Sequence, residues 1–431
     1  MVVGLIYYYK VAPPDDFLRH IRYSDYKPLG GYSYMFPHSF FEKLHFDLWY
    51  GFDPIAGWAR SVLGAGGAIF FFEALFTSLF ILALLVNIKP ASDPDLFPLI
   101  LVALFSFLSS ALSRVFLIRP AILLGIIFLF SLKGRRALSG FLIALVGAFL
   151  YWLYWLYMVP LAIGHFYKGS RRFAAGAAAG TVVGLIGVVY FSHGQYLDAV
   201  SGIISALFSG RGELKISESK FFIHALTNAS VYFWVALAAL TFYRRRKLDF
   251  YFFLIIITLP LALQVRYFAD LTFPLLFIYA MNGNETWMRE FYSRSKPVVN
   301  LFGLGALMLL IFPATAASPS LELAGLDLPK GSVVFTEDMR IMYKAVYHNK
   351  EPLRIMPSCE LGWNDSETKD MIIKIRSRDA IDESVCGYLQ SRNVDYLLSA
   401  KPVEAGCLEH KKTFFKPGFE GRVDLWQFIQ K

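Results

Sequence analysis

The chain lacks the short motifs that mark nucleotide and metal sites. It contains no Gly-x-x-x-x-Gly-Lys loop and no Gly-x-Gly-x-x-Gly turn, so nucleotide-driven pumping within this chain is unsupported. It contains no His-Glu-x-x-His or Cys-x-x-Cys metal signature. There is no internal repeat strong enough to claim and no low-complexity segment.

Cysteine is also scarce. The three cysteines, Cys359, Cys386 and Cys407, all lie in the last quarter of the 431 residues. A disulfide is possible there if the region is extracytoplasmic, and one thiol must then be left over.

Charged residues make up only 17% of the chain, whereas apolar residues make up 56% and the mean hydropathy is +0.47. The apolar share and the mean hydropathy are well above those of soluble proteins and predict an integral membrane protein. The net charge of +9 would suit nucleic acid. However, Lys and Arg occur in short loops between apolar runs rather than along one soluble face, so we expect no nucleic-acid partner.

The apolar runs and the basic clusters between them predict a topology. The clusters at 133–136 and 168–172 can both be cytoplasmic only if the stretch 140–166 crosses twice, as two short helices meeting near residues 151–155. A single tilted helix is the alternative. With two crossings in 140–166, the chain has about eleven transmembrane helices, in apolar runs at 2–12, 66–88, 97–117, 119–132, 140–166, 173–192, 222–243, 249–264, 268–283 and 298–317.

This topology predicts two domains in the cell membrane. A multi-pass helical membrane domain covers 1–317, with a cytoplasmic N-terminus and long outer loops at 13–64 and 193–221. A small extracytoplasmic α/β domain covers 318–431. Within it we expect strands at 331–336 and 394–399 and helices at 366–378 and 382–392, from the apolar periodicity.

Asp15 and Asp16, followed by Arg19 and His20, end the first apolar run. Carboxylates at a membrane boundary are costly to desolvate, so this group indicates a polar site at the bilayer surface. The alternative is a solvated loop that merely stops the first run. Asp53 is a second acidic candidate near the end of the same loop.

Arginines on the same predicted side could hold an anion. Arg114 and Arg119 flank the junction of two runs, and Arg266 lies between two others. Arg can bind a phosphate with two parallel hydrogen bonds, although snorkelling to head groups, or pairing of Arg266 with Asp270, would also explain these positions. Glu73 lies inside an apolar run, which favours a functional role or a pair with an arginine.

A divalent metal is possible but not required. His20, His38 and His45 could be ligands together with Asp47 or Asp53. Histidines in an aromatic-rich loop are more often structural, so the sequence leaves the metal unknown.

The order of these elements resembles the GT-C class of integral membrane glycosyltransferases, which includes protein mannosyltransferases, aminoarabinose transferases and oligosaccharyltransferases. The resemblance is carried by the acidic motif at Asp15-Asp16, by Arg119-Pro120 at the start of a run, and by Arg266-Tyr267 before a late run. The chain departs from the oligosaccharyltransferases, because it has no Trp-Trp-Asp motif near its C-terminus.

The resemblance implies a transferase that moves a sugar from a polyprenyl-phosphate-linked donor to a glycan, lipid or protein acceptor at the outer face. Asp16, or Asp15 or Asp53, would be the general base. The donor phosphate would be held by the cationic and phenolic side chains Arg19, Arg114, Arg119, Arg266 and Tyr267. A transporter or flippase of a lipid-linked or anionic substrate is the alternative, favoured by Glu73 and the broken stretch 140–166. A membrane scaffold without catalytic activity is a third.

Overall fold

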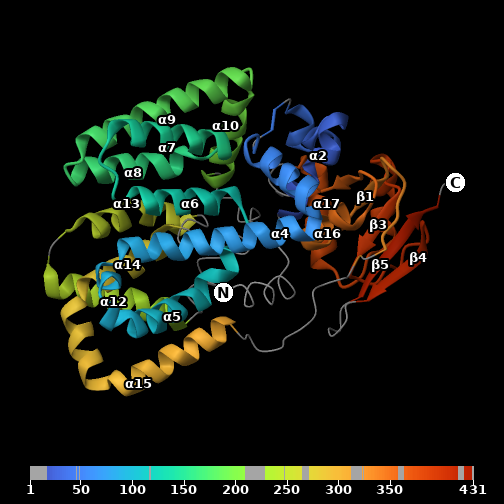
Figure 1. Cartoon of the computed structure of the whole chain (residues 1–431). Coiled ribbons are helices and arrows are strands. Elements are labelled where there is room, and N and C mark those ends of the chain that lie inside the picture. The colour runs from blue at the N-terminus through green and yellow to red at the C-terminus, as the bar shows by residue number, and fades with distance from the viewer. Residues whose placement is uncertain are drawn as a thin grey trace.

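A computed structural model shows a bundle of helices joined to a C-terminal five-stranded sheet with its own helices (Figure 1). It describes residues 17–44, 46–47, 49–115, 118–208, 229–246, 248–264, 271–311, 323, 325–357, 364–415 and 422–429. Short 3-10 helices lie at Lys27–Leu29, Phe40–Lys43, Lys89–Ser92, Pro94–Leu96 and Glu383–Val385. The α-helices are α2 (Phe17–Tyr26), α3 (Tyr32–Met35), α4 (Phe52–Asn87), α5 (Phe97–Val115), α6 (Pro120–Ser131), α7 (Ala137–Leu150), α8 (Trp155–Tyr167), α9 (Arg171–Phe191), α10 (Gln195–Phe208), α12 (Ala229–Arg245), α13 (Phe250–Gln264), α14 (Phe273–Gly283), α15 (Glu285–Ile311), α16 (Met339–His348), α17 (Ser366–Ser377) and α18 (Cys386–Ser391). The strands are β1 (Val333–Phe335), β2 (Arg354–Met356), β3 (Tyr396–Ser399), β4 (Leu408–Phe415) and β5 (Arg422–Phe428).

The prediction of about eleven transmembrane helices is wrong. In the described part of the chain only α4 and α9 are long and apolar enough to cross a membrane. Most apolar runs did become helices, but many of these are short: α6 has 12 residues and rises roughly 18 Å, against a hydrocarbon thickness of about 30 Å. The stretch 140–166 breaks at residues 151–154 into α7 and α8, which confirms the prediction of two short helices meeting near residues 151–155.

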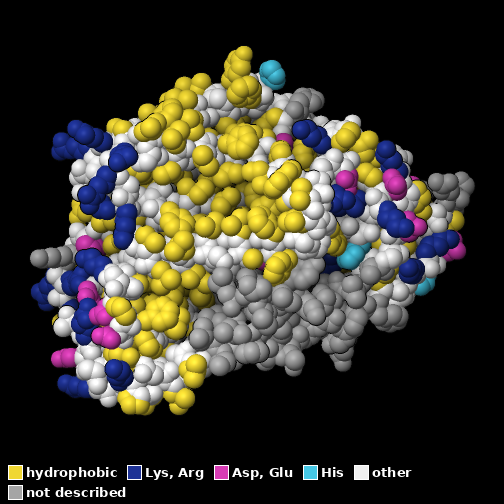
Figure 2. Space-filling view, in the orientation of Figure 1, with side chains coloured by type: hydrophobic (Ala, Val, Ile, Leu, Met, Phe, Trp, Pro, Cys, Tyr) yellow, Lys and Arg dark blue, Asp and Glu magenta, His cyan; other side chains and the backbone are white. Residues whose placement is uncertain are grey.

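The two long helices support membrane association. α9 rises roughly 32 Å, and the part of α4 after Gly64 rises roughly 34 Å, close to the thickness of the hydrocarbon core. Figure 2 shows a broad hydrophobic surface over the helices, with many Lys and Arg side chains and some Asp and Glu at one end, and mixed charges over the C-terminal part. A contiguous apolar surface of this extent is typical of contact with lipid or another protein.

Glycines allow α7 and α9 to pack at close range. A Cβ added to Gly176 would lie 1.9 Å from the carbonyl oxygen of Ala137, and one on Gly180 would lie 2.4 Å from that of Phe141. Small residues at this four-residue spacing let helix backbones approach each other, as in membrane helix pairs.

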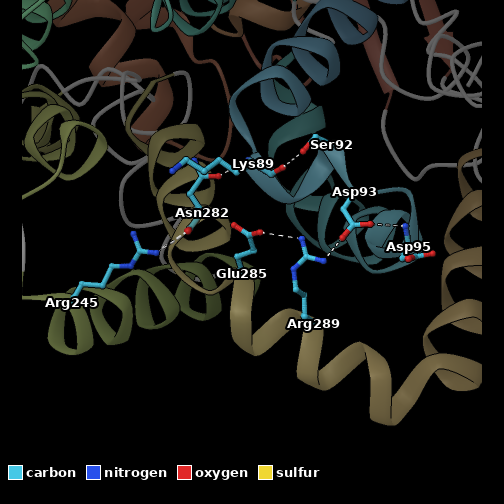
Figure 3. A network of polar contacts seen from close by, with 8 residues as sticks. All are labelled: Lys89, Ser92, Asp93, Asp95, Arg245, Asn282, Glu285 and Arg289. Atoms are coloured by element: carbon cyan, nitrogen blue, oxygen red, sulfur yellow. Dashed lines mark hydrogen bonds and ion pairs between the residues drawn. The ribbon is translucent and has the colours of Figure 1, made fainter.

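Polar side chains tie together the end of the bundle where α4 terminates (Figure 3). Asn282 accepts a hydrogen bond from the backbone N–H of Lys89 at 2.7 Å, and Arg245 donates to the carbonyl of Asn282 at 3.0 Å. Arg289 pairs with Asp93 and, at 3.2 Å, with Glu285. Nearby, Lys133 donates to the carbonyl of Val86 and Lys168 to that of Leu132. We call this the basic end.

The segment 13–64, expected to be a long loop, is largely helical where it is described. It forms α2, α3, two 3-10 helices and the first part of α4. The expected loop 193–221 likewise begins with α10. Aromatic side chains supply the core that orders the first segment: Phe17, Tyr26, Phe36 and Phe41 are fully or almost fully buried.

Gly64 folds α4 back on itself. Its φ of 70° lies in the left-handed region that glycine adopts without steric cost, and the helix changes direction there. As a result, the ring of Phe52 lies 6.0 Å from that of Phe72 and 6.4 Å from that of Phe76. In a straight helix Phe52 and Phe72 would be roughly 30 Å apart.

The C-terminal sheet has the strand order β2-β1-β3-β5-β4. β1 pairs in parallel with β2 and β3, whereas β5 pairs antiparallel with β3 and β4. β1, β3, α17 and α18 confirm the strands and helices predicted there. Cys386 and Cys407 form a disulfide, and Cys359 lies outside the described residues.

The C-terminal part packs directly on α2. Arg22 donates to the carbonyl of Lys350 at 3.0 Å, and the N–H of Leu353 donates to the hydroxyl of Tyr26 at 3.0 Å. α16 contacts α2 along this junction. The first helices and the C-terminal sheet therefore form one end of the molecule, opposite the basic end (Figure 1).

Candidate active site

A buried hydrogen-bonded group joins α2, α3 and the start of α4. His20 Nδ1 hydrogen-bonds Asp53 Oδ1, and the hydroxyl of Tyr32 donates to Asp53 Oδ2 at 2.8 Å. His20 is 0% exposed and Asp53 1%. An ionised carboxylate can only accept hydrogen bonds, so with Asp53 ionised both the Nδ1–H of His20 and the hydroxyl of Tyr32 donate to it.

The register of two helices produces this pairing. α2 runs beside the first part of α4: a Cβ on Gly57 would lie 3.2 Å from Ser24, and Arg60 pairs with Asp25 at 2.8 Å. These contacts, together with His20 and Asp53, step along both helices in the same direction, so one face of α2 meets one face of α4.

Aromatic rings enclose the group. The ring of His20 lies 5.5 Å from that of Trp49 and 5.2 Å from that of Phe52, both edge to face. The guanidinium of Arg19 lies 4.0 Å from the centroid of Trp49 and 5.2 Å from that of Tyr32. Arg19 is 2% exposed, so its charge is stabilised by ring faces as well as by polar groups.

Asp47 adds a second carboxyl beside Asp53. Burial, and then the neighbouring Asp53 carboxylate, raise the pKa of Asp47 well above its ordinary value of 3.8. One Oδ1 hydrogen bond, from the N–H of Trp49 at 2.8 Å, opposes this shift. Two adjacent carboxyls with different environments can hold one proton between them.

The fold of α4 brings the turn of helix that carries Glu73 back against Phe52. Glu73 is 0% exposed, and neither of its carboxyl oxygens has a hydrogen-bond partner within the described residues. It lies between Phe72 and Phe76, whose rings contact Phe52, the neighbour of Asp53. Phe17, the residue after Asp16, also contacts Phe72, with ring centroids 5.1 Å apart.

Of the predicted phosphate-binding residues, Arg119 lies towards the same end of the bundle as Arg19. It is 8% exposed and directly precedes α6. Asn87, at the C-terminus of α4, donates to the carbonyl of Leu129 near the C-terminus of α6, so both helices end together at the basic end. Arg119 therefore lies at the other end of α6, on the side of the candidate site.

Several predicted site residues fall outside the described part of the chain. Asp15, Asp16, Arg266 and Tyr267 belong to undescribed segments, and the side chain of Arg114 is undescribed although its backbone lies in α5. The structure places Asp53, Arg19 and His20 in one cluster and leaves these others as predictions.

Tyr32, Trp49 and the pairing of Asp53 with His20 were missed from the sequence. The density of aromatic residues in 13–64 was the available signal, but nothing in it specifies a contact across 33 positions. No group of three or more His, Cys, Asp or Glu side chains suited to a metal ion occurs among the described residues.

We compared the chain with models of known protein families, with curated proteins and with solved structures. None of the three comparisons found a match.

Proposed function

We propose that this protein is a membrane glycosyltransferase that moves a sugar from a polyprenyl-phosphate-linked donor to an acceptor hydroxyl. The observation that carries the proposal is the burial of Arg19, His20 and Asp53 in one cluster directly after Asp15 and Asp16. Burying charged groups costs free energy unless they are paired, so a cluster of this kind is a candidate for a functional site.

The proposed reaction is a direct displacement at the anomeric carbon. The acceptor oxygen forms a bond to that carbon while the bond from carbon to the phosphate oxygen breaks, and polyprenyl phosphate leaves with the bonding electrons. The acceptor proton passes to a carboxylate. A positioned general base contributes about 10²- to 10⁴-fold to such a step.

The residues divide into two groups by role. Asp16, or Asp15, is the base, because His20 and Asp53 are too deeply buried to touch an acceptor. The His20–Asp53 pair positions the aspartates, which precede His20 by four and five residues in the chain. Arg19, at 2% exposed, is about as deeply buried as His20 and Asp53 and positions the aspartates with them. Charge developing on the leaving phosphate is stabilised by Arg119, together with Arg114, Arg266 and Tyr267, whose side chains lie outside the described part of the chain.

The proposed orientation follows from charge and from the disulfide. The basic end faces the cytoplasm, where loops carry an excess of Lys and Arg. The C-terminal part, with its Cys386–Cys407 disulfide, then lies on the extracytoplasmic side, where disulfides form and persist. The N-terminus is cytoplasmic, and the candidate site opens at the outer face of the membrane.

A transporter of a lipid-linked or anionic substrate is a second candidate, favoured by one observation. Glu73 is a fully buried carboxyl without a hydrogen-bond partner within the described residues, on a helix able to cross a membrane. Intramembrane carboxyls often mark proton or substrate pathways.

A transfer assay separates the two. Purified protein is incubated with polyprenyl-phosphate mannose, glucose, galactose or aminoarabinose and with membrane extract as acceptor, and release of free polyprenyl phosphate is followed by mass spectrometry. We expect release with at least one donor and its loss in Asp16→Asn at unchanged thermal stability. Release by Asp16→Asn at the wild-type rate would remove Asp16 from the mechanism. Lipid movement across vesicles without any release would favour the transporter.

A further inference from the structure

A polar cavity of about 700 Å³ lies at one edge of the C-terminal sheet. It is formed where β1 and β3 begin and β5 ends, since Tyr396 pairs with Gln427 in the register of β3 and β5. The side chains important for the argument are Lys330, Gln390, Asn393, Asp395, Tyr396 and Gln427. Its volume falls within the range of roughly 300–1,000 Å³ typical of small-molecule sites.

The lining suits a neutral ligand with many hydroxyl groups. Gln390, Asn393 and Gln427 each present a carboxamide, which both donates and accepts hydrogen bonds, as sugar hydroxyls do. The ring of Tyr396, which is partly exposed, offers an apolar face for the C–H side of a sugar.

The charges of the lining argue against an anionic ligand. Lys330 is opposed by Asp395, so the cavity has no net charge from these side chains. Part of the capacity of Asp395 is used by the fold, because its Oδ2 accepts the N–H of Val333 at 2.8 Å. A site for a polyanion would present several Arg or Lys side chains.

The cavity lies beside the helices of the candidate active site. Gly331, in its wall, has a φ of +83°, and a Cβ there would lie 3.1 Å from the hydroxyl of Tyr34. Tyr34 belongs to α3, the short helix that also carries Tyr32, the hydrogen-bond partner of Asp53. The wall of the cavity therefore lies next to the same helix that supports the site.

We propose that this cavity binds the acceptor, and that the acceptor is a neutral oligosaccharide. The inference builds on the proposed transferase function and narrows its acceptor, which the sequence left open between glycan, lipid and protein.

Binding can be measured without any donor or turnover. The full chain is purified in a detergent that has no sugar head group and titrated with mannose, glucose and galactose tetrasaccharides, followed by saturation-transfer NMR and calorimetry. A tetragalacturonate and an uncharged octapeptide are the comparison probes. We expect at least one neutral tetrasaccharide to bind and neither comparison probe to do so.

The variant Gln390→Ala/Asn393→Gly tests the location. Both positions are exposed, and Asn393 has a φ of 52° that glycine adopts readily, so the fold is expected to persist. Loss of two hydrogen-bonding groups should weaken binding about tenfold. Asp370→Ala, an exposed change on α17 away from the cavity, is the control and should bind as the wild type does.

Failure of this inference is distinguishable from failure of the proposed function. Absence of binding by all neutral probes, equal binding of the peptide or galacturonate, or unchanged binding by the double variant would overturn the acceptor site. Sugar transfer by the double variant at the wild-type rate would also overturn the acceptor site, but it would be consistent with the proposed transferase function. Oligosaccharide binding by a protein that transfers no sugar would retain the site and contradict the transferase.

Discussion

The two ends of the helix bundle use the same residue types in opposite ways. At the basic end, Lys133, Lys168 and Arg245 donate to backbone carbonyls, and Arg289, which is about half exposed, pairs with acidic side chains. At the candidate-site end, Arg19, His20 and Asp53 are almost completely buried among aromatic rings.

The charged groups at the basic end stabilise the fold, whereas the buried charged groups at the candidate-site end cost free energy to desolvate. Cations at helix C-termini satisfy free carbonyls and remain near water, which costs little. Buried ionisable groups lose their hydration, which costs free energy that apolar residues at the same positions would not cost. The candidate-site end therefore holds the residues whose presence needs a functional explanation, and the following experiments compare it with the basic end.

Removal of the Asp53 carboxylate should have the largest effect. Asp53→Ala leaves His20 and Tyr32 buried without their shared acceptor, and we expect a loss of about 3–5 kcal/mol in the free energy of unfolding together with loss of transfer. Chemical denaturation in detergent measures the first quantity. Asp93→Ala at the basic end is the control, and an equal loss there would erase the distinction between the ends.

Removal of the Glu73 carboxylate should act in the opposite direction. Because this buried carboxyl has no hydrogen-bond partner within the described residues, Glu73→Leu should raise the unfolding free energy by about 1–3 kcal/mol. The same denaturation experiment reports it. A destabilised variant would show that Glu73 contributes to the fold, whereas a stabilised variant with slowed transfer would add Glu73 to the site.

Asp47 should make stability depend on pH. Burial and Asp53 raise its folded-state pKa above 3.8, so protonated Asp47 is favoured in the fold. Its contribution is fully present below about pH 3.8 and is lost as pH rises through the folded-state pKa. The melting temperature of the wild type minus that of Asp47→Asn should therefore fall as pH rises from 3.5 to 7. A difference that stays flat or rises would contradict this assignment.

Arg289→Ala should have the smallest effect. Its partners are at the surface of the basic end, and exposed ion pairs contribute little to stability. We expect a melting temperature and a transfer rate that are indistinguishable from those of the wild type. A clear loss of transfer would place function at the basic end as well.

Apolar runs located most helices because hydrophobic periodicity is a local property. α9, α13 and the break between α7 and α8 lie where the runs and basic clusters placed them. The number of membrane crossings failed because an apolar run does not specify how long its helix will be, as α6 and α14 show.

The candidate site could be predicted only by residue type. Asp53, Arg19 and His20 stood out as charges near a membrane boundary, but their contacts depend on the fold of α4 at Gly64 and on the register of α2 against it. Both are long-range features: the glycines at 64, 66 and 67 indicate a flexible entry to a helix but not a reversal of direction, and Tyr32 and Trp49 carry no pattern of their own.

The central claim is that burial at one end of the bundle serves catalysis, and two histidines test it directly. His20 and His165 are both 0% exposed and both hydrogen-bonded, but His165 binds the carbonyl of Ser131 near the basic end at 2.9 Å. The measurement is the pH profile of donor cleavage by His20→Ala and His165→Ala, each normalised to folded protein. We predict a loss of roughly 10²-fold and an altered profile for His20→Ala, and a wild-type profile for His165→Ala. Equal rates and profiles in the two variants would contradict the account.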